Sequence, residues 1–135
     1  MQANADAKAK ILLVEDESLI AEDIQKMLQK WGYSVIGHAV SGKQAIEIAK
    51  EDRPDLILMD IRIKGDVNGV EAAISIESHY QRSIPIIFIT AVPVRLYALI
   101  KSIDPCLYLN KPFTEQELKK CIERKLQIAN ASLGT

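Results

Sequence analysis

Four apolar runs of strand length, far apart in this chain, each stop at charged or hydroxyl residues. The runs lie within residues 11–17, 55–62, 85–91 and 107–113. They stop at Glu15 and Asp16, at Asp60, at Thr90 and at Lys111. Stretches of helical periodicity separate them, so the strands should lie parallel, with their carboxyl ends at one edge of a single sheet. Ligands bind at that edge in open α/β sheets, so the sequence predicts one site that gathers these side chains.

The stretches between the strands carry apolar residues at helical spacing, which predicts a helix after every strand. The helices are expected to begin at about residue 18, at Ser41, near Gly69, at Pro93 and at Thr114. The starts at Ser41 and Thr114 have capping-box partners three residues later, Gln44 and Glu117. The helix after Gly69 is expected to bury Val70, Ala73 and Ile74.

The predicted strands differ in how apolar they are. They span residues 11–14, 34–39, 55–60, 85–90 and 106–109. The first, third and fourth are nearly all apolar, as the central strands of a parallel sheet should be. The second and fifth are mixed in character and fit the edges. This assignment gives the strand order 2-1-3-4-5 in an α/β, doubly wound, five-stranded parallel sheet with helices on both faces.

Length and composition limit what the chain can be. Its 135 residues suffice for one domain, which we place at residues 10–129 between tails at 1–9 and 130–135. A net charge of −1 gives no basic footprint for direct nucleic-acid binding. No apolar run is long enough to cross a bilayer and no signal region opens the chain, so we expect a cytoplasmic protein with no membrane partner. Cys106 and Cys121 are expected to be reduced thiols used in packing.

The motifs at the strand ends, in this order, resemble those of the receiver domain of two-component response regulators. An acidic pair, an aspartate, Thr-Ala and Lys-Pro follow one another across about residues 9–129. The resemblance implies the flavodoxin-like (βα)5 three-layer fold of the chemotaxis regulators and supports the same strand order. It also implies a signalling switch of a phosphorelay rather than a dedicated enzyme. Asp60 would accept a phosphoryl group from a sensor histidine kinase or a phosphotransfer protein, with self-catalysed transfer and slow autodephosphorylation.

The residue types suit that chemistry. Clustered carboxylates raise one another's pKa, and a divalent cation, Mg²⁺ or Mn²⁺, relieves the repulsion with oxygen ligands. Asp16 and Asp60 can each supply one oxygen, and Glu15 can hold a coordinated water. The resemblance implies that the backbone carbonyl of Arg62 completes the protein ligands. Asp60 can then attack phosphorus as a carboxylate nucleophile.

Further residues are expected to meet the charge on the transferring phosphoryl group. The Lys111 ammonium would take one oxygen, and the Thr90 hydroxyl with the Ala91 N–H another. Lys111 is expected to gain a charged partner only when the phosphoryl group is present. The resemblance also implies a cis peptide bond between Lys111 and Pro112. It implies a switch in which Thr90 moves toward the phosphoryl group while Tyr108 turns inward.

Two segments depart from the common family pattern. After Asp60, Lys64 stands where a proline is common, Arg62 brings a long cation beside the pocket, and the loop is one residue longer. The stretch at 92–103 is unusually apolar. Such an excess predicts a partner surface formed by the fourth helix, fifth strand and fifth helix, with a homodimer through the face at 92–126 as one outcome.

Parts of this pattern also occur in proteins of other kinds. Taken singly, the acidic pair suits a helix start, Thr90 a local hydrogen bond, and Lys111 the solvated surface. A phosphatase that forms an aspartyl phosphate needs a carboxylate two residues after its nucleophile, where Arg62 stands. A flavin-binding carrier needs a Ser/Thr/Gly-rich loop after the first strand, where this chain is acidic. A degenerate receiver used only to bind proteins is disfavoured by the intact set of site residues.

Overall fold

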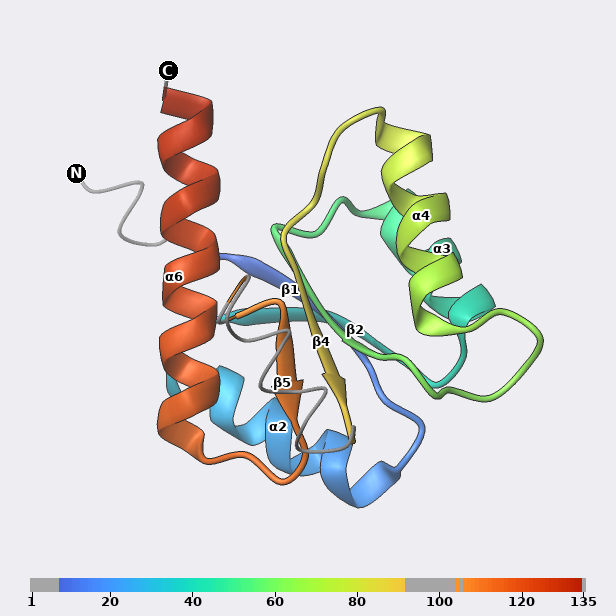
Figure 1. Ribbon diagram of the computed structural model, residues 1–135, viewed down its shortest axis with the longest axis horizontal. Helices are drawn as coiled ribbons and strands as arrows, with labels where there is room; N and C mark the ends of the chain where they lie inside the picture. The colour runs from blue at the N-terminus through green and yellow to red at the C-terminus, as the bar shows by residue number, and fades with distance from the viewer. Residues whose placement is uncertain (1–7, 92–103, 105, 135) are drawn as a thin grey trace.

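The computed structural model describes residues 8–91, 104 and 106–134, with side chains as far as residue 128. Within these residues, five parallel strands form one sheet in the order β2-β1-β3-β4-β5, as the sequence predicted (Figure 1). The strands are β1 (Lys10–Val14), β2 (Ser34–Ala39), β3 (Leu56–Asp60), β4 (Ile86–Thr90) and β5 (Tyr108–Asn110). The helices are α2 (Ser18–Lys30), α3 (Gly42–Glu51), α4 (Gly69–Tyr80) and α6 (Glu115–Gly134).

Helices cover both faces of the sheet and divide the core in two (Figure 1). On one face α2 and α6 pack against β1, β3 and β4 through side chains such as Ile24 and Ile122. On the other face α3 and α4 cover the same strands through small residues such as Ala45 and Ala72. β3 is buried at all of its positions, as its apolar run predicted. The sheet therefore provides a rigid frame that ends at the predicted site.

The predicted helix caps are present, with one difference in detail. At Thr114 both capping-box bonds form, since Thr114 and Glu117 each accept a hydrogen bond from the other's N–H. At Ser41, the hydroxyl accepts from the Gln44 N–H at 3.2 Å, but the Gln44 side chain accepts from Val40 instead of Ser41. The predicted helix start at Pro93 and the 92–103 part of the predicted partner surface lie outside the described residues.

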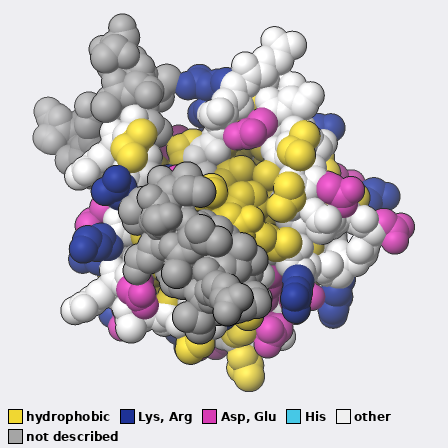
Figure 2. Space-filling view, viewed as in Figure 1, with side chains coloured by type: hydrophobic (Ala, Val, Ile, Leu, Met, Phe, Trp, Pro, Cys, Tyr) yellow, Lys and Arg dark blue, Asp and Glu magenta, His cyan; other side chains and the backbone are white. Residues whose placement is uncertain are grey.

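The prediction for the buried side of α4 was partly wrong. Ala73 is buried, but Val70 and Ile74 are 38% and 62% exposed. The buried positions of α4 are Gly69, Ala72, Ala73 and Ile76. Small side chains on this side let α4 approach α3 closely, which turns the larger side chains outward. Figure 2 shows hydrophobic side chains gathered near the middle of the face that it views.

Two predictions near β5 also need correction. The strand begins two residues later than expected, at Tyr108, because Cys106 and Leu107 lie in a turn held by Asp104. Cys106 and Cys121 are joined in a disulfide with 5.2 Å between their Cα atoms, so the expectation of two reduced thiols was wrong. Sequence spacing could not reveal that the turn before β5 packs against α6.

No helix among the described residues is long and apolar enough to cross a membrane.

Candidate functional site

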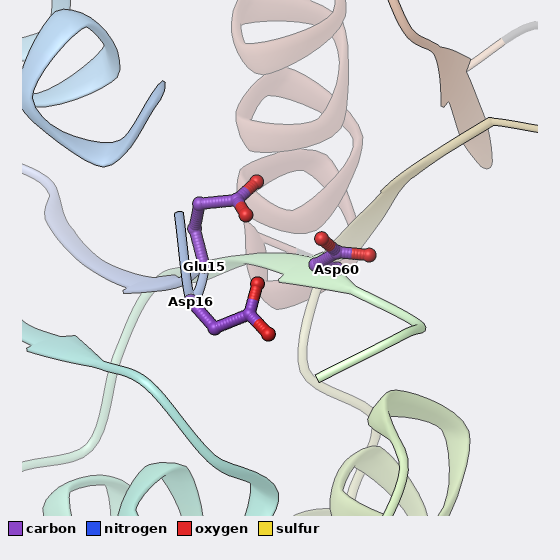
Figure 3. Close-up of side chains that lie close together, drawn as sticks. All are labelled: Glu15, Asp16 and Asp60. Atoms are coloured by element: carbon purple, nitrogen blue, oxygen red, sulfur yellow. The ribbon is translucent and has the colours of Figure 1, made fainter. Parts of the chain in front are cut away.

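Three carboxylates meet at the carboxyl ends of β1 and β3. Glu15 and Asp16 directly follow β1, and Asp60 is the last residue of β3. The two strands are paired in parallel, with Val14 opposite Met59, so their ends coincide. One carboxylate oxygen from each of the three residues lies within 4.8 Å of the others (Figure 3). The predicted cluster is therefore formed by the sheet itself and not by a loop that would have to fold over it.

Lys111 pairs with two of these carboxylates. Its Nζ lies 2.8 Å from Glu15 Oε1 and 3.0 Å from Asp60 Oδ2. The ammonium therefore has charged partners without any phosphoryl group, and the expectation that it would lack them was wrong. The sequence placed Lys111 at the right edge but could not show that Glu15 is turned inward, where only 1% of the residue is exposed.

Burial and the ion pairs act in opposite directions on the pKa values of Glu15 and Lys111. Burial raises the pKa of Glu15 above its ordinary value, although hydrogen bonds from Lys111 and from the Glu17 N–H oppose this shift. Burial also acts to lower the pKa of Lys111, but its hydrogen bonds to Glu15 and Asp60 outweigh that effect and leave the pKa raised. Lys111 is therefore a fixed cation at neutral pH.

Backbone N–H groups hold the remaining oxygens of the two buried carboxylates. The Glu17 N–H donates to Glu15 Oε2 at 3.1 Å, and the Arg62 N–H donates to Asp60 Oδ1 at 3.0 Å. Asp16 differs, because its carboxylate has no hydrogen bond to any part of the chain that the structure describes. Its side chain is half-buried at the rim of the cluster and keeps both oxygens available for a ligand.

The ends of β4 and β5 complete the site. Thr90, the last residue of β4, is buried, while Ala91 beside it is exposed. The Lys111 N–H donates to the Thr90 carbonyl at 3.0 Å, which joins the two strand ends. The Lys111–Pro112 peptide bond is cis, as predicted. All the strand-end residues predicted for the site thus lie along one edge of the sheet.

The sequence is matched over residues 11–123 by the family model of the response regulator receiver domain. This chain belongs to that family. Receiver domains are the signalling domains of two-component response regulators. The transcriptional regulatory protein PdtaR of Mycobacterium tuberculosis is 36% identical over 122 residues, which cover 90% of this chain and 58% of that protein. The phyllosphere-induced regulator PhyR of Methylorubrum extorquens is 35% identical, over 90% of this chain and 45% of its own length.

Solved structures agree with the family assignment. PhyR from Brucella abortus superimposes with a TM-score of 0.80 at 30% identity, covering 97% of this chain and 54% of that one. The receiver domain of a modulated diguanylate cyclase from Desulfovibrio desulfuricans gives 0.77 at 32% identity, covering 93% and 99%. This receiver domain spans about half the length of the curated relatives that it matches.

The donor set of this receiver domain fits a small, hard divalent cation. All three residues of the cluster offer carboxylate oxygens, which Mg²⁺ and Mn²⁺ prefer. The unpaired Asp16 is the member most ready to bind, whereas Glu15 and Asp60 each share an oxygen with Lys111. A cation would relieve the same repulsion that Lys111 relieves among the described residues.

Two residues that support the site were not recognised from the sequence. The His38 ring nitrogen Nε2 lies 2.7 Å from the Glu15 carbonyl oxygen, so this side chain helps hold Glu15. Gly69 packs against the backbone of Asp60 and Ile61, where an added Cβ would collide with the Asp60 carbonyl oxygen. His38 had a usable signal, since it precedes the end of β2, the strand paired with β1.

Tyr108 lies close to the site but does not enter it. Its ring is half-buried on β5 and tilted against Phe88 on β4, with 5.5 Å between the ring centroids. The two residues are direct partners in the β4–β5 register. Thr90 is paired two positions farther along the same ladder, with Asn110. Thr90 and Tyr108 are therefore connected through one pair of strands.

Proposed function

We propose that this receiver domain accepts a phosphoryl group on Asp60 from the phosphohistidine of a sensor histidine kinase or a phosphotransfer protein. The observation that carries the proposal is the cluster of Glu15, Asp16 and Asp60, of which Lys111 neutralises two members. Carboxylates gathered this closely repel one another. A site that must hold a cation and a phosphoryl group explains the arrangement.

Asp60 is prepared to act as the nucleophile. The Lys111 ammonium and the Arg62 N–H each donate a hydrogen bond to one of its oxygens, which fixes the orientation of the carboxylate. One Asp60 oxygen forms a bond to phosphorus as the bond from phosphorus to the donor's histidine nitrogen breaks. The Lys111 ammonium then moves from Asp60 to a phosphoryl oxygen, and the Thr90 hydroxyl and Ala91 N–H take another. The domain is a phosphoacceptor that supports transfer to itself and slow autodephosphorylation.

A divalent cation, Mg²⁺ or Mn²⁺, is part of the proposal. Asp16 and Asp60 would hold it directly, Glu15 through a water, and the Arg62 carbonyl from the loop after β3. When bound, it supplies positive charge at the phosphoryl oxygens during transfer. Asp16 is suited to the first contact because no described hydrogen bond has to break.

An apolar groove beside Lys111 offers the phosphoryl donor a place to dock. It lies between α2 and the β5–α6 connection and has a volume of about 450 Å³. Its lining includes Ile24, Met27, Phe113 and Lys111. An apolar groove next to a reactive group is where a protein partner can gain affinity and position its own reactive residue. The proposal places this encounter in the cytoplasm.

Phosphorylation is proposed to change a second surface. Thr90 would move toward the phosphoryl group and Tyr108 would turn inward from its contact with Phe88. The affected face includes β5 and the described part of α6, within the range 92–126 where a homodimer or another partner was predicted. The phosphoryl group would change the affinity of an existing surface for its partner and would not build a new surface.

The experiment is incubation with a small phosphodonor and Mg²⁺, followed by intact-mass measurement of wild type, Asp60→Asn and Asp55→Asn. Asp55 precedes the same strand at its opposite end, so it is the matched control. Wild type and Asp55→Asn should each gain one base-labile phosphoryl group, and a chelator should prevent this. Undiminished labelling of Asp60→Asn, or equal labelling in chelator, would contradict the proposal.

A further inference from the structure

The Cys106–Cys121 disulfide lies away from the phosphorylation site, at the opposite end of β5. Cys106 comes two residues before β5, while Lys111 directly follows it. The two Cα atoms are 5.2 Å apart, within the range that a disulfide requires without movement of the backbone. The residues are only 4% and 6% exposed, and the chain has no other cysteine.

A second, non-covalent tie holds the same turn against α6. Lys125 Nζ lies 2.9 Å from Asp104 Oδ2, and Asp104 Oδ1 accepts a hydrogen bond from the Cys106 N–H at 3.0 Å. Lys125 is four residues after Cys121, so both ties come from one side of α6. If the disulfide is reduced, the ion pair and the surrounding core still keep the two sulfur atoms adjacent. The bond can therefore form and break without rearrangement of the fold.

The fold has little need of a permanent covalent staple. A chain of this length buries a full core, and Cys106 and Cys121 pack within it beside residues such as Leu118. The next step rests on the proposed function, which places the protein in the cytoplasm. Thiols are kept reduced there, and disulfides that do form are usually catalytic or redox-sensing. A single pair of adjacent cysteines outside the phosphorylation site fits the second role, with peroxide reaching the pair when the turn before β5 opens locally.

We propose that Cys106 and Cys121 form a reversible redox site that locks the turn before β5 onto α6 when a peroxide oxidises it. One thiol attacks the peroxide oxygen, which gives a sulfenic acid and releases water from hydrogen peroxide. The second thiol displaces the sulfenic oxygen as another water and forms the S–S bond. Two thiols are oxidised and one hydrogen peroxide is reduced to two waters. A dithiol reverses the step and becomes a disulfide itself.

The lock acts on the strand that carries Lys111. β5 is the edge strand and is bonded to β4 alone within the sheet. The turn at Cys106 fixes the amino end of β5. The hydrogen bond from the Lys111 N–H to the Thr90 carbonyl fixes its carboxyl end. Oxidation therefore removes freedom from β5 and α6 while leaving α3 and α4, on the other face, unchanged. Local opening of β5 and the middle of α6 should become rarer.

The test compares wild-type protein treated with hydrogen peroxide and with dithiothreitol, without any phosphodonor or Mg²⁺. Oxidation should make the chain two hydrogen atoms lighter and remove both titratable thiols, and dithiothreitol should restore them. Amide exchange at Leu109 and Ile122 should slow by at least about tenfold in the oxidised form. Exchange at Ala49, on α3, should stay the same in both forms. Cys106→Ala and Cys121→Ala should show no redox dependence at any of these positions.

Several results would overturn the proposal. One is that both thiols remain titratable after peroxide treatment. Another is that oxidation yields only cross-linked chains or sulfinic acid. A third is that amide exchange at Leu109 and Ile122 is identical in the two forms. The comparison between oxidised and reduced wild type needs no substitution, so a variant that folds poorly cannot decide it. Because Asp60 takes no part in the measurement, failure here and failure of phosphorylation are separate outcomes.

Discussion

Lys111 is the side chain on which the charge of the site depends. Glu15 and Asp60 are both buried, and Lys111 is the cation that contacts them. Lys111→Met keeps an unbranched side chain but removes the cation that pairs with two buried carboxylates. We expect the free energy of unfolding to fall by roughly 2 kcal/mol at neutral pH, measured by urea denaturation.

The matched control is Lys30→Met. Lys30 also pairs with a glutamate, Glu115, at 3.0 Å, but both side chains are more than half exposed. An exposed ion pair contributes little, so the loss should be within about 0.5 kcal/mol. Equal losses in the two variants would contradict the special position of Lys111. Addition of Mg²⁺ should restore part of the loss in Lys111→Met alone.

Glu15 should make stability depend on pH. Folding raises its pKa above the ordinary value of 4.5, so the folded state holds this proton more tightly than the unfolded state. Wild type should therefore gain stability as the pH falls from neutral toward 4.5 through the raised pKa. Glu15→Gln lacks this dependence and should be more stable than wild type at neutral pH.

The advantage of Glu15→Gln should shrink as the pH falls and vanish below the ordinary pKa of 4.5, where wild type is protonated in both states. Urea denaturation across a pH series measures this difference. Glu17→Gln is the control, since Glu17 is exposed and holds Glu15 only through its backbone N–H. A constant difference between Glu15→Gln and wild type at every pH would refute the role assigned to burial.

At the scale of the elements, the sequence predicted strands better than the sides of helices. β3 and β4 were found within one residue because an apolar run that stops at Asp60 or Thr90 is unmistakable. The buried side of α4 was predicted only in part, because its rotation depends on contacts with α3 and on Gly69, which no local pattern shows. The start of β5 was predicted two residues too early because Cys106 and Leu107 belong to the turn that Asp104 holds.

The candidate site divides in the same way. Parallel strands bring their carboxyl ends to one edge, so Asp16, Asp60 and Lys111 could be brought together from the sequence. The pairing of Lys111 with Glu15, and of Cys106 with Cys121, depends on which way a side chain turns after its strand or in its turn. Such orientations come from tertiary packing, which sequence spacing does not contain.

Gly69 joins α4 to β3, the strand that ends at the proposed phosphoacceptor Asp60, and its substitution should be costly. An alanine there would collide with the Asp60 carbonyl oxygen and lie 2.9 Å from the Ile61 Cα. A glycine-to-alanine change in an unhindered helix stabilises by about 0.5–1 kcal/mol. Gly69→Ala should instead destabilise by about 1–3 kcal/mol in urea, because backbone atoms cannot give way.

Ser78→Ala, at an exposed position on α4, is the control for this change. It alters the same helix without touching the Asp60 backbone and should stay within about 0.5 kcal/mol of wild type. Gly69→Ala should also slow the proposed phosphorylation of Asp60, because the displaced carbonyl belongs to Asp60 itself. A gain in stability in Gly69→Ala would show that α4 can shift away from β3 at little cost.

At the scale of the whole molecule, the two halves of the core meet in the sheet, and the site lies where the sheet ends. Ile24 and Ile122 on one face, and Ala45 and Ala72 on the other, hold the strands whose ends carry the carboxylates. Packing of the core therefore keeps the carboxylates of Glu15, Asp16 and Asp60 close together although they repel one another. A ligand that relieves the repulsion binds only the folded chain and must stabilise it.

Stability should consequently rise with the concentration of Mg²⁺. At a concentration one hundred times the dissociation constant, the gain in wild type should be about 2.7 kcal/mol. Asp16→Asn should lose most of this gain yet match wild type without the cation, because no described hydrogen bond of Asp16 is lost. Asp23→Asn, an exposed position on α2, should keep it. Thermal unfolding at constant ionic strength measures all three, with NaCl replacing MgCl₂ as reference. If Asp16→Asn gains as much as Asp23→Asn, the cation acts by general screening, and the cluster of Glu15, Asp16 and Asp60 is not its site.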